Sequence, residues 1–377
     1  MKNIHIEKLH YVEILKISII SLVIFLHVCE IFSYPAITYI KDNSINCEEL
    51  TIIVRFFNQW IMSAMFFFAG IGSYYSLKSK TWKKYVVERI KRLYIPMIFG
   101  TLFLVSIQTY ILAKTQYGFN GSLFDFIPVF IGKTGISPDG YLNWGHLWFI
   151  SYLFHFSLLA LPFFVYSLKE SKPNFIQKIL YIIEKGSVYL PLVLLILIEC
   201  VFRPHWPGSL DLINDWANFL TYFLVFVYGF LFVGGFLKLQ YKKLNRTILL
   251  IVYLISSIAM FIYWHFPYPK EAYNFEYLSL RIASVFYTWL SIIFWIDLGR
   301  NKFNVSNRFI QYASSLTMPF YVLHYVVLTV IGYYVVQLKL EMISKIALVF
   351  IPSFIVTVLA CEIVKRFVVL RFLLGLK

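Results

Sequence analysis

Lys16 and His27 share the first strongly apolar stretch of the sequence, where ten uncharged residues separate them. In an α-helix, eleven positions correspond to almost three turns, so both side chains project from one face, roughly 16 Å apart along the axis. An ionisable side chain at membrane depth is costly and is therefore a candidate for function. The imidazole of His27 can take a proton from a hydroxyl group near neutral pH, and the Lys16 ammonium can attract an anion.

Two carboxylates flank this pair at helical spacing. Glu13 precedes Lys16 by three positions and Glu30 follows His27 by three, which places both near the same stripe of the helix. We expect Glu30 to orient His27 or to stabilise its imidazolium. The alternative for this face is a lysine that reaches for the membrane surface beside a hydrogen-bonded structural histidine.

A basic cluster, "KKYVVERIKRLYIP", precedes the third apolar segment. Arg89 and Arg92 are three positions apart and are predicted to share a helix face. Arginine forks bind phosphate groups in a bidentate manner. The alternative is anchoring on the positive inner side of a membrane, including attraction to anionic lipids. Pro96 follows at a point where a helix could begin or kink.

Two further stretches carry histidine beside aromatic residues. "GHLWFISYL" has His146 and Trp148 at the outer start of an apolar segment, and "SSLTMPFYVLHYVV" has Tyr321 three positions before His324. The pattern places His324 in the outer half of its segment, as it does His27, and Pro319 is expected to break that helix. Packing and interfacial anchoring are the alternatives for these residues.

The composition places the elements that must position these residues in a lipid bilayer. Apolar residues make up 60% of the chain and charged residues 14%, far from the balance of a soluble domain. A spanning helix needs about 20 mostly apolar residues. The sequence predicts an all-α bundle of about ten transmembrane helices, forming a single domain over residues 1–377 without a fused soluble domain. The predicted segments are 12–34, 52–77, 93–114, 146–168, 187–203, 216–238, 247–266, 278–298, 308–337 and 343–364.

The distribution of lysine and arginine predicts the orientation. The loops that share a side with the N-terminus carry most of these residues, including the run 78–92, which favours a cytoplasmic location for both termini. The net charge of +15 is therefore a topology signal, and we expect no nucleic-acid partner. The four cysteines show no paired spacing, so no metal site is predicted.

Taken together and in order, these motifs resemble acyltransferase family 3, a family of integral membrane O-acyltransferases. "EILKISIISLVIFLH" is similar to the family's arginine, ten residues and histidine, with Lys16 in the arginine position. "RIKRLYIP", "MFFFAGIGSYYSLKSK", "GHLWFISYL" and "SLTMPFYVLH" are similar to other family motifs. "VSIQTYIL" and "WPGSLDLINDWANFL" look like the subgroup of glucan-modifying acetyl- and succinyltransferases. Two departures are the lysine at position 16, which lacks the bidentate fork of arginine, and the absence of a glutamate after the histidine–tryptophan pair.

The resemblance implies that an acyl group, such as acetyl or succinyl, moves from cytoplasmic acyl-CoA to an extracytoplasmic carbohydrate at a bacterial cytoplasmic membrane. Lys16, Arg89 and Arg92 would then bind the donor, and His27 and Glu30 would be catalytic. His27 would act as general base or as acyl relay; the sequence leaves both routes open. The acceptor-binding side chains would be His146, Trp148, Tyr321 and His324.

Other classes of membrane protein fit the same residues. A proton-coupled transporter or glycan flippase could use Lys16, His27, Glu30 and Glu199 as a proton relay. A catalytically lapsed scaffold is compatible with lysine at position 16.

Overall fold

The computed structural model describes residues 9–34, 38–132, 135, 140–185, 189–235, 246–266 and 271–376. Most of them are helical, and the described part contains no β-strand, only an isolated bridge between Ser33 and Cys47. The N-terminal Lys2 and Lys8 and most of the basic loop 238–246 lie outside the described residues, as do the first two positions of the predicted segment 187–203 and the last three of 216–238.

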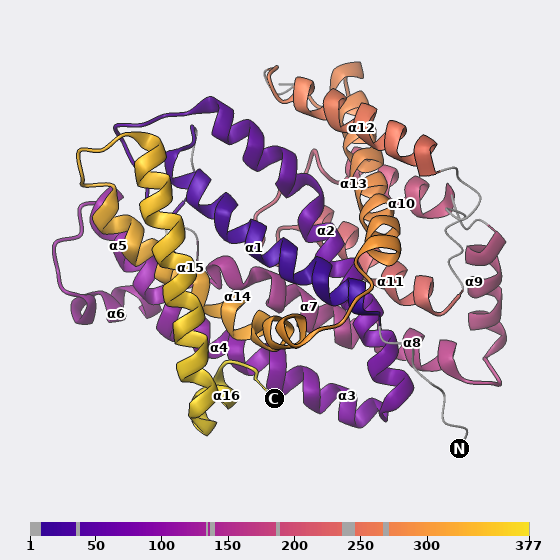
Figure 1. The fold of residues 1–377 in the computed structure, drawn as a ribbon. Coiled ribbons are helices and arrows are strands. Elements are labelled where there is room, and N and C mark those ends of the chain that lie inside the picture. The colour runs from indigo at the N-terminus through magenta and orange to yellow at the C-terminus, as the bar shows by residue number, and fades with distance from the viewer. Residues whose placement is uncertain are drawn as a thin grey trace. The chain divides into compact units, whose positions relative to one another are not determined.

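The predicted segments fall on helices, which Figure 1 shows together with several shorter helices between them. In chain order they are α1 (His10–Phe32), α2 (Glu48–Ser79), α3 (Trp82–Arg89), η1 (Ile90–Tyr94), α4 (Ile95–Gly100), η2 (Thr101–Val105), α5 (Ser106–Gln116), α6 (Leu123–Gly132), η3 (Gly145–Leu147), α7 (Trp148–Leu159), α8 (Leu161–Leu168), α9 (Asn174–Lys185), α10 (Tyr189–Val201), α11 (Trp216–Val233), α12 (Arg246–Tyr263), α13 (Phe275–Lys302), α14 (Arg308–Val335), α15 (Met342–Arg366) and α16 (Val368–Leu373).

Eight helices of the described chain are long and apolar enough to cross a membrane. A ninth crossing results if Gly145–Leu159 and Leu161–Leu168, which meet at a bend of 50°, form one span. The remaining predicted segment, 187–203, corresponds to the 13 residues of α10, fewer than a straight crossing needs. The chain is therefore an all-α, multi-pass membrane protein, as its hydropathy predicts.

Two prolines bear on the course of the helices, Pro319, where the sequence predicts a break, and Pro96, where it predicts a start or a kink. Pro319 lies inside α14, which continues from Arg308 to Val335, so the predicted break is wrong. Near Pro96, a single helical segment runs from Trp82 to Gln116 and contains two π-helical turns, η1 and η2, on either side of α4. Membrane helices tolerate proline because neighbouring groups and local π adjustments accommodate the lost backbone bond.

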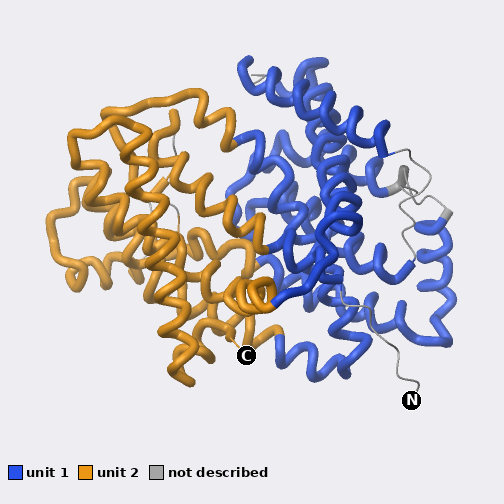
Figure 2. Tube along the Cα trace, in the orientation of Figure 1, with its two compact units in different colours: residues 1–16, 55–88, 152–307 blue, residues 17–54, 89–151, 308–377 orange. Residues whose placement is uncertain are grey.

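The chain divides into two compact units, each assembled from separate stretches of sequence (Figure 2). Unit 1 contains Met1–Lys16, Arg55–Glu88 and Tyr152–Asn307, and unit 2 contains Ile17–Val54, Arg89–Ser151 and Arg308–Lys377. Within unit 1, α13 packs against α10 and α12; within unit 2, α14 packs against α15 and α5. Helix α1 belongs to both, with Lys16 in unit 1 and His27 in unit 2.

Aromatic side chains and close backbone contacts make up the interior of unit 1. The rings of Phe164 and Phe230 stack with centroids 3.7 Å apart. A Cβ atom at Gly229 of α11 would collide with the backbone of Phe67 on α2. Small residues at such crossings let membrane helices pack backbone to backbone.

Candidate functional site

Helix α1 ends with a histidine–carboxylate pair in unit 2. Nδ1 of His27 lies 2.8 Å from Oε2 of Glu30, which is the contact that the three-residue spacing predicts. Because an ionised carboxylate only accepts hydrogen bonds, Nδ1 carries the hydrogen and Nε2 of the neutral ring holds a lone pair. Nε2 of His27 has no hydrogen-bond partner among the described residues. The side chain of His27 is 23% exposed, so this nitrogen belongs to a partly accessible base.

Two rings of α14 pack against His27. The Tyr325 ring stacks on the imidazole with centroids 4.2 Å apart, and the His324 ring lies at 5.7 Å in a near-parallel orientation. The Tyr325 hydroxyl is in turn hydrogen-bonded to Thr38 at 3.1 Å. Tyr325 and Glu30 therefore fix the position and orientation of the His27 ring from two sides.

His324 also keeps one nitrogen without a partner. Its Nδ1 donates to the backbone carbonyl of Tyr321 at 2.7 Å, so Nε2 again holds the lone pair. His324 is 1% exposed, and its buried Nε2 has no hydrogen-bond partner in the described part of the chain. A buried polar atom left unpaired is costly. The ring that carries this atom has its centroid 5.7 Å from that of His27, so two imidazole rings of the cluster keep a nitrogen able to accept a hydrogen bond.

His146 completes a cluster of three histidines, but its ring nitrogens are both engaged. Nε2 lies 3.1 Å from the carbonyl oxygen of Val322, and Nδ1 lies 3.2 Å from Oε1 of Gln108. Its ring centroid is 5.5 Å from that of His324. A ring that donates from Nε2 accepts at Nδ1, so a neutral His146 needs the amide NH2 of Gln108 at this position. The amide oxygen of the buried Gln108 is then the group left to accept a hydrogen bond.

The turn before α7 brings His146 into the cluster. Gly145 has a φ of +47°, and a Cβ atom there would collide with the Tyr39 hydroxyl, so glycine is required. The Tyr321 hydroxyl donates to the backbone carbonyl of His146 at 2.5 Å. These contacts tie α14 to the start of α7 and hold the cluster in place.

A buried ion pair supports the C-terminal end of α1. Nζ of Lys345, on α15, lies 2.5 Å from Oδ2 of Asp42, and both side chains are almost fully buried. The backbone N–H of Asp42 donates to the carbonyl of Ile31 at 3.0 Å. Burial alone would raise the pKa of Asp42, but hydrogen bonds from Lys345 and Ser44 hold the pKa below the usual range of an aspartate. The loop after α1 is thereby attached to α15 next to His27 and Glu30.

The structure brings together five of the nine residues that the sequence singles out: His27, Glu30, His146, Tyr321 and His324. Trp148 follows directly at the start of α7 and is half-buried beside Phe149. Gln108 and Tyr325, which complete the cluster, lie within quoted motifs but are not singled out by them as site residues. A polar Gln108 in an apolar helix, and the four-residue spacing from Tyr321 to Tyr325, are the signals that could have identified them.

The predicted donor-binding cations lie elsewhere. Arg89 ends α3 and Arg92 lies in the π turn η1, so α-helical spacing does not by itself place them on a common face. The continuous helical segment Trp82–Gln116 carries both Arg92 and Gln108, which are roughly 20–24 Å apart along its axis. Lys16 is half-buried in unit 1, and its ammonium lies 4.0 Å from the position that a Cβ atom on Gly72 would take.

Two other predictions bear on this arrangement. Glu199, a proton-relay candidate, is hydrogen-bonded by the guanidinium of Arg203 at 2.6 and 2.9 Å. Among the residues that the structure describes, no three His, Cys, Asp or Glu side chains come together in a group that could hold a metal ion.

A family model described as an acyltransferase domain matches residues 9–362, nearly the whole chain. Comparison with curated protein sequences and with solved structures gives no match.

Proposed function

Because the chain belongs to acyltransferase family 3, a family of membrane acyltransferases, we propose that it moves an acyl group from cytoplasmic acyl-CoA to a hydroxyl of an extracytoplasmic carbohydrate. The observation that carries this proposal is the His27–Glu30 pair, in which Nδ1 donates to the carboxylate at 2.8 Å and Nε2 is left as a base. The proposed location is the cytoplasmic membrane of a bacterium, with both termini inside.

In the proposed reaction, Nε2 of His27 takes the proton of the acceptor hydroxyl, and the hydroxyl oxygen attacks the thioester carbonyl carbon. Glu30 stabilises the imidazolium that forms. The carbon–sulfur bond then breaks, and the imidazolium returns the proton to the departing thiolate. In the alternative route, Nε2 of His27 attacks the thioester carbonyl carbon and the carbon–sulfur bond breaks, releasing the thiolate of coenzyme A. The sugar hydroxyl then attacks the acyl-imidazole, the carbon–nitrogen bond breaks, and the hydroxyl proton ends on the coenzyme A thiol.

The acceptor-side residues divide into two kinds. The Tyr321 hydroxyl donates its hydrogen to the His146 carbonyl, and both ring nitrogens of His146 are already hydrogen-bonded. These two residues therefore support the cluster. His324 keeps Nε2 to accept from a hydroxyl. We therefore assign acceptor orientation to His324 and support to His146 and Tyr321, with Trp148 as a sugar-facing side chain at the start of α7.

Donor binding is proposed for Arg89, Arg92 and Lys16. The distance along the helix from Arg92 to Gln108, roughly 20–24 Å, is of the order of an extended phosphopantetheine arm. Arginines at one end of this helical segment would hold the phosphates of coenzyme A while the thioester lies beside the histidine cluster.

Ligand-dependent stability separates the enzyme from a transporter. Acyl-CoA or coenzyme A should raise the thermal unfolding midpoint of the purified protein in detergent, since a ligand that binds only the folded state stabilises it. A proton-coupled transporter or flippase would not respond. Absence of any shift with saturating acyl-CoA would contradict donor binding, and mass spectrometry of envelope polysaccharides after deletion would identify the acyl group and acceptor.

A further inference from the structure

A cavity of about 490 Å³ lies within unit 1, and none of its lining residues belongs to the histidine cluster. Helices α2, α10, α11 and α13 contribute to its wall, together with the segments that follow α10 and α12. Its lining includes three guanidinium groups, one carboxylate, three side-chain amides, hydroxyls and aromatic rings. The charged members are Arg55, Arg203, Arg281 and Glu199.

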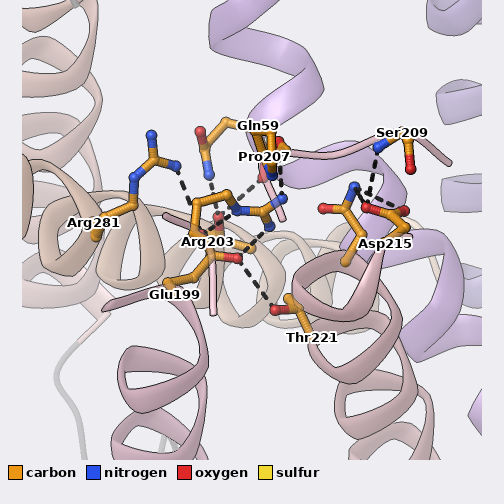
Figure 3. A network of polar contacts seen from close by, with 10 residues as sticks. Gln59, Glu199, Arg203, Pro207, Ser209, Asp215, Thr221 and Arg281 are labelled. Carbon is orange, nitrogen blue, oxygen red and sulfur yellow. Dashed lines mark hydrogen bonds and ion pairs between the residues drawn. The ribbon is translucent and has the colours of Figure 1, made fainter. Parts of the chain in front are cut away.

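Glu199 is the acidic centre of this lining, and two arginines converge on it (Figure 3). Arg203 makes a bidentate pair with its carboxylate, at 2.6 and 2.9 Å, and Nη1 of Arg281 lies 3.6 Å from Oε2. Thr221 adds a hydrogen bond at 3.2 Å. One carboxylate can neutralise one of the three guanidinium charges, so the cavity keeps a positive excess.

Arg55 carries much of this excess. Its guanidinium has no carboxylate partner in the described part of the chain and lies over the Trp264 ring, 5.6 Å from the centroid. The indole Nε1 of Trp264 is buried and has no hydrogen-bond partner among the described residues. A purely structural ion-pair network would explain the Glu199–Arg203 contact. It would not explain why the Arg55 guanidinium and the Trp264 indole N–H lack acceptors. A ligand rich in acceptor atoms would satisfy both.

The loop that carries Arg203 is held in one conformation by Asp215. The carboxylate of Asp215 accepts from the backbone N–H groups of Ser209 at 3.2 Å and Leu210 at 3.1 Å, and from the Tyr152 hydroxyl at 2.5 Å. Leu210 and Leu212 have φ values of 56° and 68°, a strained region for side chains of this size. Strain of this kind persists only where the surroundings enforce it and is common at ligand sites.

We propose that this cavity binds the anionic group of a small hydroxylated ligand, a carboxylate or phosphate attached to a sugar or polyol. Guanidinium forks match both anions, and the side-chain amides and hydroxyls of the lining match a polyol. The volume lies within the usual range of small-molecule sites. The proposal does not rest on acyl transfer, since binding is measured without an acyl donor.

The test uses the purified full-length protein in detergent and isothermal titration calorimetry, with thermal unfolding as a second readout. The probes are glucose 6-phosphate, glucuronate and glycerol 3-phosphate, with glucose as the neutral control. The anions should bind and raise the unfolding midpoint, and glucose should do neither. Tight binding of glycerol 3-phosphate alone would assign the anion to a lipid headgroup, and preference for the two sugar anions would assign it to an acidic saccharide.

The decisive variant is Arg55→Gln, because Arg55 has no ion-pair partner among the residues that the structure describes, so its replacement breaks no known salt bridge. It should weaken binding of the preferred anion about tenfold or more, the effect of a lost charge-assisted contact. The matched control is Arg246→Gln, whose side chain is 68% exposed and pairs with Asp297 outside the cavity. Equal affinities of the two variants, or no anion binding at about 10 mM, where a millimolar site would be nearly saturated, would overturn the proposal.

Discussion

The histidine cluster of unit 2 and the arginine-lined cavity of unit 1 present opposite hydrogen-bonding groups. In the cluster, the ring N–H groups of His27 and His324 are used on Glu30 and on a backbone carbonyl, and the unpaired atoms are lone pairs. In the cavity, the groups that lack a hydrogen-bond partner within the described chain include two donors, the Arg55 guanidinium and the Trp264 indole N–H. A bare imidazole nitrogen accepts a proton, whereas a bare guanidinium or indole N–H requires an anion or another acceptor.

The difference shows that residue type alone does not define a site. His146 and Tyr321 are as suited to chemistry as His27 and His324, but their hydrogen-bonding capacity is engaged. Likewise, Arg203 is held by Glu199, whereas Arg55 is not paired in the described part of the chain. The atoms left over after internal pairing indicate what each region can bind or transform.

The largest effect is expected for His27→Ala, which removes the proposed base. Acyl transfer should fall by about 10²–10⁴-fold or become undetectable, as for the loss of a general base. Binding of glucose 6-phosphate in the arginine-lined cavity should be unchanged. The measurement is acyl incorporation into the glycan by mass spectrometry, together with calorimetry. His265→Ala, at an exposed histidine near the end of α12, is the control, and full transfer by His27→Ala would refute the mechanism.

Lys345→Met should be the most destabilising of these substitutions in unit 2. It leaves the buried carboxylate of Asp42 without its cation, and breaking a buried pair costs about 3–5 kcal/mol. Hydrogen exchange should rise in the loop around Asp42 and at the start of α15, with the loop around Asp215 in unit 1 unaffected. Lys339→Met, at an exposed lysine on the preceding turn, should leave stability unchanged.

Lowering the pH should reproduce, in the unmodified protein, part of the stability loss expected for Lys345→Met. Because the pKa of folded Asp42 is below the ordinary value, its stabilisation is present above the pKa of an unfolded aspartate, about 4, and disappears as the pH falls through the folded value. The unfolding midpoint of Lys345→Met should therefore change less with acid than that of the unmodified protein. If the unfolding midpoints of the two proteins fall in parallel with pH, the Asp42–Lys345 pair does not contribute to stability.

His324→Gln should lower acyl transfer about 10–100-fold, the effect of one lost hydrogen bond to the acceptor of about 1–3 kcal/mol. It should also raise the KM for the glycan and leave the unfolding midpoint near that of the unmodified protein. His146→Gln should show the reverse pattern, with a lower midpoint, because both of its ring nitrogens are engaged internally. If both variants lose stability equally, the distinction between the two histidines is wrong.

The smallest effect is expected for Arg89→Ala, which removes one phosphate contact of the donor. The KM for acyl-CoA should rise about tenfold, as for one charge-assisted contact, with a lesser change in kcat. Acyl-CoA should also produce a smaller rise in the unfolding midpoint. Arg246→Gln is again the control. An unchanged KM would place donor binding elsewhere.

Hydropathy and helical spacing predict much of this protein. The apolar segments are helices in the structure, and the His27–Glu30 contact follows from a three-residue spacing on one helix. The same reasoning could have found the Glu199–Arg203 pair, which is four residues apart. It fails at Pro319, because whether proline breaks a helix depends on what surrounds the lost backbone bond.

The sequence by itself determined the helical, membrane-spanning class, the family and the set of histidines, because these depend on composition, order and short-range spacing. Only the tertiary structure decided that His27, His146 and His324 meet, that Gln108 and Tyr325 join them, and that Arg55 faces a cavity. The physical reason is that each nitrogen or oxygen is assigned its role by the partner nearest to it in space, and these partners come from helices far apart in the chain.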